Sequence, residues 1–164
     1  MSTASPSTLR AAIVTVPVIL GIGFLMGRLS NSGYGNGWFD ALAKPAVMPP
    51  GWAFGVAWSL LYVLIGIAVA MIWAAAPSRA RSAGLALFAV QLLLNFSWSP
   101  LFFGLHQIVP ALVILVAILA LSVATTAAFA RVRPAAAWLM APYLAWLAFA
   151  TYLNFEIWRL NPGG

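Results

Sequence analysis

Charged side chains are few in this sequence, and they divide it into long uncharged segments. Eight basic and two acidic residues are spread over 164 positions, and between them lie stretches such as "ALVILVAILALSVATTAAFA" (111–130). A helix needs about 20 apolar residues to cross the roughly 30 Å of hydrocarbon in a bilayer, and a soluble domain carries far more charge. We therefore predict an all-α, polytopic membrane protein: a bundle of five transmembrane helices forming a single domain over 1–164. The spans are expected near 9–29, 51–76, 83–104, 108–130 and 135–158, with a long loop at 30–50.

A β-barrel and a cleaved signal peptide are alternatives that the sequence favours less. A transmembrane barrel alternates apolar and polar residues, whereas these segments are apolar on every side, so helices must satisfy their own backbones. The first segment follows Arg10 and therefore resembles a signal peptide. It is long enough to span and is not followed by a small-x-small cleavage site, so we expect it to be retained.

The distribution of charge predicts an orientation. One end of the bundle would carry Arg10, Arg79, Arg81, Arg131 and Arg133, and the other would carry Arg28, Lys44, Arg159, Asp40 and Glu156. The excess of arginine on the first side favours a cytoplasmic N-terminus, expected here in a bacterial membrane. The net charge of +6 belongs to these connections, so it predicts contact with lipid headgroups and no nucleic-acid partner.

Composition also limits the chemistry. The chain has no cysteine, one histidine and two acids, which excludes thiolate sites and predicts no metal site and no obligatory cofactor. No orthodox acid–base or nucleophile pattern is present, so an enzymatic activity stays uncertain. The "GYGNG" segment (33–37) resembles a phosphate loop, but it follows no predicted strand and lacks the Lys-Ser/Thr pair, so turn formation is favoured.

Three predicted helices each carry a stripe of residues that suit a protein interior better than lipid. Helical spacing aligns Gln91, Asn95, Trp98 and Phe102 on one span, Tyr143, Trp146, Ala150 and Asn154 on another, and Trp52, Gly55, Ser59, Tyr62 and Gly66 on a third. An unpaired amide in hydrocarbon costs several kcal/mol, so Asn95 needs a partner or a cavity.

Two interpretations of these stripes remain open. Small residues bring helices close together, and Gly23 and Gly27 form a GxxxG motif of the kind found at helix contacts, including those of dimers. Packing alone accounts less well for Trp58, Trp98 and Trp146, which lie deep in their spans and carry N–H donors that need acceptors. We therefore favour a pocket with aromatic walls and an amide floor. The remaining tryptophans lie near span ends, where an interfacial belt is expected.

The loop at 30–50 is longer than the other connections, and loops of this length are commonly functional lids. Its "WFDALAKP" segment (38–45) predicts a helical turn that begins at Asp40 and ends before Pro45. Because Trp58, Trp98 and Asn95 lie in the halves of their helices nearer this loop, the pocket should open beneath it.

Three segments resemble one known family. "WFDALAKPAVMPPGWAFGVAWSLLY" (38–62), "QLLLNFSWSPLFFGLHQ" (91–107) and "PYLAWLAFATYLNFEIWRLN" (142–161) are similar to the TspO/translocator protein family, which includes bacterial tryptophan-rich sensory proteins and mitochondrial benzodiazepine receptors. The resemblance extends over about 13–161. It implies a five-helix bundle, commonly a homodimer, that binds porphyrin, haem, sterols and synthetic isoquinoline or benzodiazepine ligands between its helices under the first loop.

The resemblance also implies site residues. Together with Gln91, which shares the stripe of Asn95, the expected ligand-binding set is Trp38, Pro45, Trp58, Gln91, Asn95, Trp98, Trp146, Ala150 and Leu153. In some bacterial relatives the positions of Trp58 and Trp146 are linked to light-dependent porphyrin degradation, which makes these two the candidate residues if the protein has that activity.

Other matches are weaker. The family's sterol-binding signature runs from Leu through Tyr to Arg, and here it would be Leu153, Phe155 and Arg159, so the tyrosine hydroxyl is missing. His106 is a conceivable axial haem ligand, although interfacial hydrogen bonding suits its place at a span end better. Glu156 and Arg159 are spaced for an interfacial ion pair.

Three function classes follow. The first is a tetrapyrrole-binding sensor or regulator, which needs only a pocket and a lid. The second is a transporter of porphyrins or sterol-like lipids, although no inverted repeat or broken helix pair is evident. The third is a light-dependent porphyrin-degrading enzyme. We place them in that order.

Overall fold

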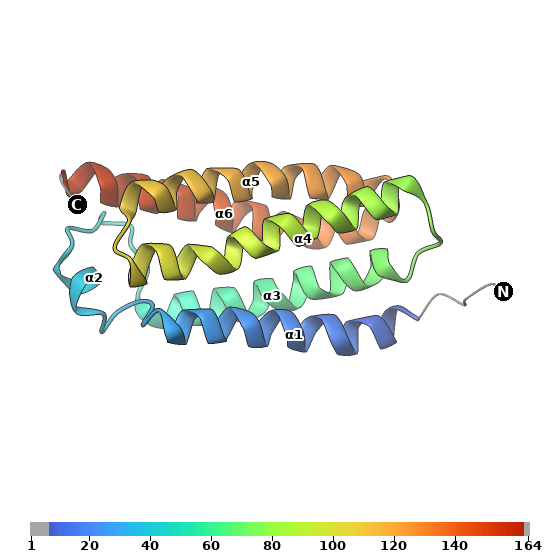
Figure 1. Cartoon of the computed structure of the whole chain (residues 1–164), viewed down its shortest axis with the longest axis horizontal. Coiled ribbons are helices and arrows are strands. Elements are labelled where there is room, and N and C mark those ends of the chain that lie inside the picture. Colours follow the sequence, from blue (N-terminus) through green and yellow to red (C-terminus); the bar gives the residue numbers. More distant parts are fainter. Residues whose placement is uncertain (1–6, 163–164) are drawn as a thin grey trace.

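The computed structural model of the chain describes residues 7–162, and five long helices run side by side through it (Figure 1). The elements are α1 (Thr8–Leu29), α2 (Gly37–Ala41), α3 (Gly51–Trp73), α4 (Arg79–Ser99), η1 (Pro100–Gly104), α5 (Ile108–Ala130) and α6 (Pro134–Leu160). With η1 continuing α4, five helices of 22 to 27 residues are long and apolar enough to cross a membrane. The predicted all-α membrane bundle is confirmed.

The predicted boundaries differ from the observed ones by three or more residues at two helices. α4 begins at Arg79 instead of 83, because the Ser78 side chain accepts a hydrogen bond from the Arg81 N–H and caps the helix ahead of the apolar segment. α3 ends at Trp73 instead of 76, in keeping with Pro77 and its effect on the preceding residue. Apolar length therefore located the spans, and local capping set their ends.

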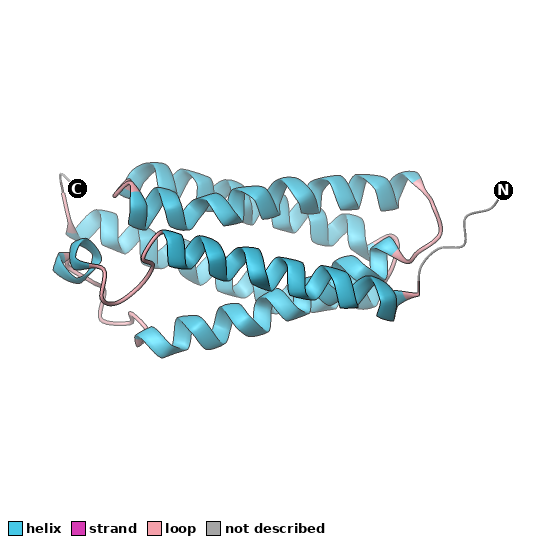
Figure 2. Cartoon of the chain, turned by 60° about the horizontal axis from the view of Figure 1, so that its bottom comes forward, coloured by secondary structure: helices cyan, strands magenta, loops and turns pink. Residues whose placement is uncertain are grey.

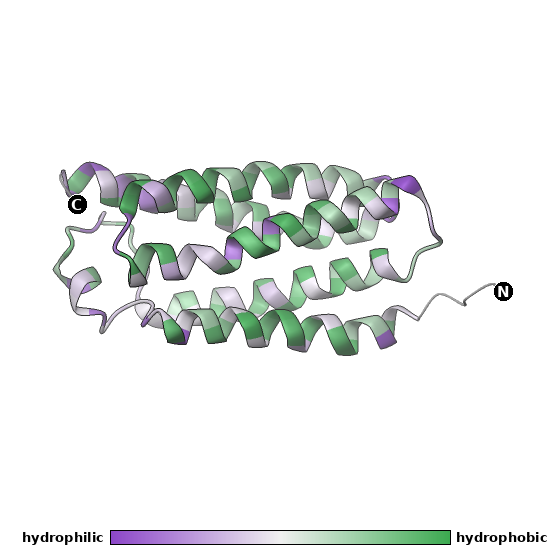
Figure 3. Ribbon diagram, viewed as in Figure 1, coloured by the Kyte–Doolittle hydropathy of each residue, from purple (hydrophilic) through white to green (hydrophobic). Residues whose placement is uncertain are grey.

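The outer surface of the bundle suits lipid. Hydrophobic residues predominate along the long helices and hydrophilic ones gather towards the ends, apart from hydrophilic bands within α4 (Figure 3). Trp52, Trp73, Trp138 and Trp158 are exposed near helix ends, which agrees with the predicted interfacial positions. The charged residues fall at the two ends of the bundle as expected, and which end faces the cytoplasm stays a prediction.

α1 packs against α3 through small residues. A Cβ added to Gly23 would overlap the Tyr62 ring, and one added to Gly66 would lie 2.8 Å from the Val16 side chain. The Thr15 hydroxyl donates to the Gly66 carbonyl at 2.7 Å across the same contact. Gly23 therefore serves a helix contact within one chain, and homodimerisation stays an expectation.

The α3 stripe inferred from the sequence is only partly correct. Tyr62 and Gly66 are buried, but Trp52 is 72% exposed. The Ser59 hydroxyl donates to the Gly55 carbonyl of its own helix. The lipid-facing side of a membrane helix is as apolar as its interior side, so spacing alone did not identify which side turns inward.

η1 is a π-helical turn that extends α4 towards the lid. The Leu105 N–H donates to the Pro100 carbonyl, five residues back, at 2.9 Å. This wider turn lets the adjacent Phe102 and Phe103 both point inward, with 1% and 8% of their surfaces exposed. In a regular α-helix, neighbouring side chains diverge by about 100°.

The lid, residues 30–50, lies at the end of the bundle where α6 ends (Figures 1 and 2). Its short helix α2 begins after Asn36, whose Oδ1 accepts from the Phe39 N–H at 3.1 Å. The predicted opening at Asp40 is therefore wrong. Asp40 instead accepts from the Gly35 N–H at 3.0 Å, because the tight turn before α2 brings that amide to its carboxylate.

Two asparagines fasten the lid to the bundle. Asn36 Nδ2 lies 3.4 Å from the carbonyl of Phe103 on η1. At the end of α6, the Asn161 side chain accepts from the Ala43 N–H and donates to the Ala43 carbonyl, both at 2.9 Å. The lid is thus held from both sides.

Candidate functional site

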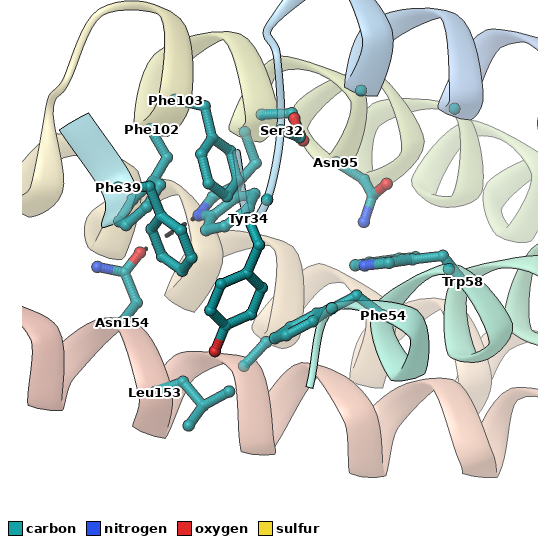
Figure 4. A pocket seen from close by; sticks show the side chains of 18 of the residues that line it. Ser32, Tyr34, Phe39, Phe54, Trp58, Asn95, Phe102, Phe103, Leu153 and Asn154 are labelled. Atoms are coloured by element: carbon teal, nitrogen blue, oxygen red, sulfur yellow. Dashed lines mark hydrogen bonds between the residues drawn. The ribbon is translucent and has the colours of Figure 1, made fainter. Parts of the chain in front are cut away.

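A cavity of about 680 Å³ lies between the helices beneath the lid. α1, α3, α4, η1, α5 and α6 contribute to its walls, and lid residues line its outer end. Figure 4 shows Tyr34 projecting from the lid among the aromatic side chains, with Asn95 and Trp58 on facing helices. The predicted position under the first loop agrees with this geometry.

Most residues singled out from the sequence line this cavity. The lining includes Trp58, Asn95, Trp98, Trp146, Ala150 and Leu153. Within the described part of the chain, Trp38, Pro45 and Gln91 are absent from the lining, so their placement in the wall is corrected. Trp38 stacks on His106 with ring centroids 4.4 Å apart, Pro45 is buried within the lid, and Gln91 lies one turn deeper than Asn95 with no exposed surface.

Aromatic side chains form the walls. The rings of Trp58 and Trp146 are 6.3 Å apart and nearly perpendicular at 83°. Trp98 stacks on Phe102 at 5.0 Å with an angle of 13° between the planes. Phe54 meets Trp146 edge to face at 5.9 Å. Flat apolar surfaces therefore bound the cavity in more than one orientation.

A chain of buried hydrogen bonds forms the floor. The Tyr62 hydroxyl donates to Asn95 Oδ1 at 3.0 Å, and Asn95 Nδ2 donates to the Tyr143 hydroxyl at 3.1 Å. Tyr143 in turn donates to Gln91 Oε1 at 2.8 Å, which also accepts from the Ser122 hydroxyl at 3.1 Å. This network joins α3, α4, α5 and α6, and it fixes the direction in which the Asn95 amide faces.

The deep indoles differ in whether their donors are satisfied. Trp98 Nε1 donates to Asn154 Oδ1 at 3.3 Å, and Asn154 Nδ2 donates to the Ile108 carbonyl at 3.1 Å. Trp146 Nε1 is buried and has no hydrogen-bond partner among residues 7–162. An unsatisfied buried donor costs about 1–3 kcal/mol, so an acceptor atom on a bound molecule would stabilise this arrangement.

Known proteins with similar sequences place the chain in a family. The sequence profile of the TspO/MBR family matches residues 13–159. The chain belongs to the TspO/MBR family. It is 43% identical to the translocator protein of Sus scrofa over 97% of this chain and 94% of that protein. It is 40% identical to the tryptophan-rich protein TspO of Chlorobaculum tepidum, over 76% and 80% of the two chains. The tryptophan-rich sensory protein of Cereibacter sphaeroides is 39% identical over 76% of this chain and 77% of its own length. The family resemblance inferred from the sequence is thereby confirmed, and the chain is a multi-pass integral membrane protein.

The three residues that match the sterol-binding signature of the TspO/MBR family do not lie together. Leu153 is buried and lines it, but Phe155 is 41% exposed on the opposite side of α6. Arg159 pairs with Glu156 at 2.6 Å, which confirms the predicted ion pair. Leu153, Phe155 and Arg159 thus share no single surface, because residues two apart on a helix point in nearly opposite directions.

The cavity lining of this TspO/MBR protein includes residues that the sequence did not suggest, and it leaves out one that the sequence did suggest. His106, a conceivable axial ligand from the sequence, lies outside the lining of the cavity in the described residues. No group of three or more His, Asp or Glu side chains within 7–162 could hold a metal ion. Tyr34, Phe39 and Phe54 contribute aromatic surface, and Arg28 contributes a charge. A lone arginine at a span end usually marks only the boundary of the span, so the sequence did not identify Arg28 as a lining residue.

Proposed function

We propose that the cavity binds a tetrapyrrole, a porphyrin or haem, and that the protein acts as a membrane sensor or regulator of that ligand. The observation that carries this proposal is the buried Trp146 N–H, unpaired among residues 7–162 at the wall of an aromatic cavity. A planar ligand would lie against the aromatic wall to which this indole belongs, and an acceptor atom on the ligand would satisfy the donor.

The size and chemistry of the cavity support a ligand of this class. Small-molecule sites commonly enclose about 300–1,000 Å³, with apolar walls and a few polar groups that set orientation. The volume of about 680 Å³ falls within that range, and Asn95 supplies a fixed amide at the floor.

Binding and sensing fit the fold better than transport. The floor of the cavity is closed by the network through Asn95 and Tyr143, and the lid is fastened through Asn161. Relatives carry both kinds of name, translocator and sensory protein. A carrier would need a second opening at the far end of the bundle, where the packed side chains of α4, α5 and α6 stand in the way.

Quenching of tryptophan fluorescence by protoporphyrin IX tests the proposal with the full chain in nanodiscs. Trp146→Phe keeps an aromatic ring and removes the N–H, so the affinity should fall about fivefold, the equivalent of roughly 1 kcal/mol for one hydrogen bond. Trp138→Phe is the matched control, since Trp138 is 78% exposed. Equal affinities for wild type and Trp146→Phe would reject this cavity as the binding site.

A second candidate, light-dependent degradation of the bound porphyrin, is favoured by one observation. The indoles of Trp58 and Trp146 both line the cavity, so either could contact a bound porphyrin. Dioxygen would be the oxidant: the light-excited porphyrin would take an electron from an indole and pass it to dioxygen, and the superoxide so formed would oxidise the ring. Illumination in air with absorbance detection tests this. Porphyrin loss that is equal in wild type and in the double Trp→Phe variant would exclude the two indoles.

A further inference from the structure

One charged side chain lines the cavity. Among residues 7–162, Arg28 is the only formally charged residue in its wall, and it lies in the last turn of α1 where the chain enters the lid. Asn31 and Ser32, the polar residues that follow, line the same end. The cavity is therefore aromatic in its depth and polar at its mouth.

The other cations at this end of the bundle are already engaged. Lys44 Nζ donates to the carbonyls of Asp40 and Leu42, both at 3.1 Å, and lies 4.6 Å from the centre of the Phe39 ring. The Arg159 guanidinium lies 2.6 Å from the Glu156 carboxylate. The guanidinium of Arg28 has no hydrogen-bond or ion-pair partner within 7–162, and its side chain is exposed at the mouth.

A guanidinium group matches one class of chemical partner closely. Its planar fork donates two parallel hydrogen bonds to a carboxylate, which makes such pairs stronger and more directional than those of an ammonium group. The carbonyl end of the α1 dipole also favours a cation at this position. The alternative is that Arg28 extends to lipid headgroup phosphates, as arginines at span ends commonly do.

We propose that Arg28 recognises a carboxylate of the bound ligand, so that the cavity selects flat apolar molecules with an anionic edge. This inference rests on the proposed tetrapyrrole binding and adds an orientation to it. The ring lies against the aromatic wall to which Trp58 and Trp146 belong, and the carboxylate-bearing edge faces the lid beside Arg28. The place of Arg28 in the lining, beside Asn31 and Ser32 at the mouth, favours the cavity ligand over the headgroups as the partner.

The experiment compares protoporphyrin IX with its dimethyl ester, which has the same ring but no charge. Both are titrated against wild type, Arg28→Gln, Arg28→Lys and the control Arg131→Gln, in nanodiscs of zwitterionic lipid. Arg131 carries the same charge at the opposite end of the bundle and is also exposed. Arg28→Gln should weaken binding of the free acid about tenfold and leave the ester unchanged. Arg28→Lys should show a smaller loss, and Arg131→Gln none.

Each outcome has a distinct meaning. If wild type binds neither compound, the proposed function fails. If wild type binds the ester as tightly as the free acid, or if Arg28→Gln weakens both compounds equally or neither, recognition of the carboxylate by Arg28 is overturned while binding in the cavity stands. The comparison of free acid with ester needs only the wild-type protein, so it holds even if a variant fails to fold.

Discussion

The Tyr143 hydroxyl joins the two halves of the buried network, and its removal should destabilise the bundle. Tyr143 is fully buried, and it accepts from Asn95 at 3.1 Å and donates to Gln91 at 2.8 Å. Tyr143→Phe keeps the ring and deletes both bonds. Interhelical hydrogen bonds in membranes average about 0.6 kcal/mol and reach about 1.7, so losing two should lower the free energy of unfolding by about 1–3 kcal/mol.

The assay is unfolding of the purified protein by SDS titration, followed by circular dichroism. Tyr152→Phe is the matched control on the same helix, because Tyr152 is 47% exposed. Affinity for protoporphyrin IX should also fall in Tyr143→Phe, since the Asn95 amide loses the partner that orients it. Equal stability of Tyr143→Phe and Tyr152→Phe would refute the view that the network holds the four helices in register.

Two further predictions concern the α1–α3 contact and the lid. Gly66→Ala should destabilise the protein by about 1–3 kcal/mol, because its new Cβ would lie 3.0 Å from the Val16 backbone. Gly21 has open space around it, so the control Gly21→Ala should be neutral in the same unfolding assay. Asn161→Ala removes two hydrogen bonds to Ala43 of the lid and should speed porphyrin release several-fold in stopped-flow fluorescence. An unchanged release rate would show that the lid does not gate the ligand.

The spans were predictable because hydrocarbon imposes a minimum length of apolar sequence, and the charges at 10, 28, 131 and 133 mark its limits. The inward faces of α4 and α6 were also predictable. Asn95, Trp98 and Trp146 are too polar to face lipid, so their spacing identified the side that lines the cavity.

The inward face of α3 and the details of the lid were not predictable in the same way. Trp52 and Tyr62 are both aromatic, and nothing in their spacing distinguishes an interfacial ring from a buried one. Gln91 lies on the same helical stripe as Asn95, but its side-chain oxygen accepts hydrogen bonds from Tyr143 and Ser122. This contact joins three helices, and only the packed fold brings them together.

The π turn of η1 has an evolutionary consequence. Its hydrogen bond spans five residues where that of the α-helix spans four, and this wider turn leaves the adjacent Phe102 and Phe103 both buried and both in the lining of the cavity. Removing a single residue from 100–104 would restore an ordinary helix and swing one of these rings towards the membrane. This short segment is therefore a place where one codon gained or lost would reshape both the cavity entrance and the attachment of the lid through Asn36.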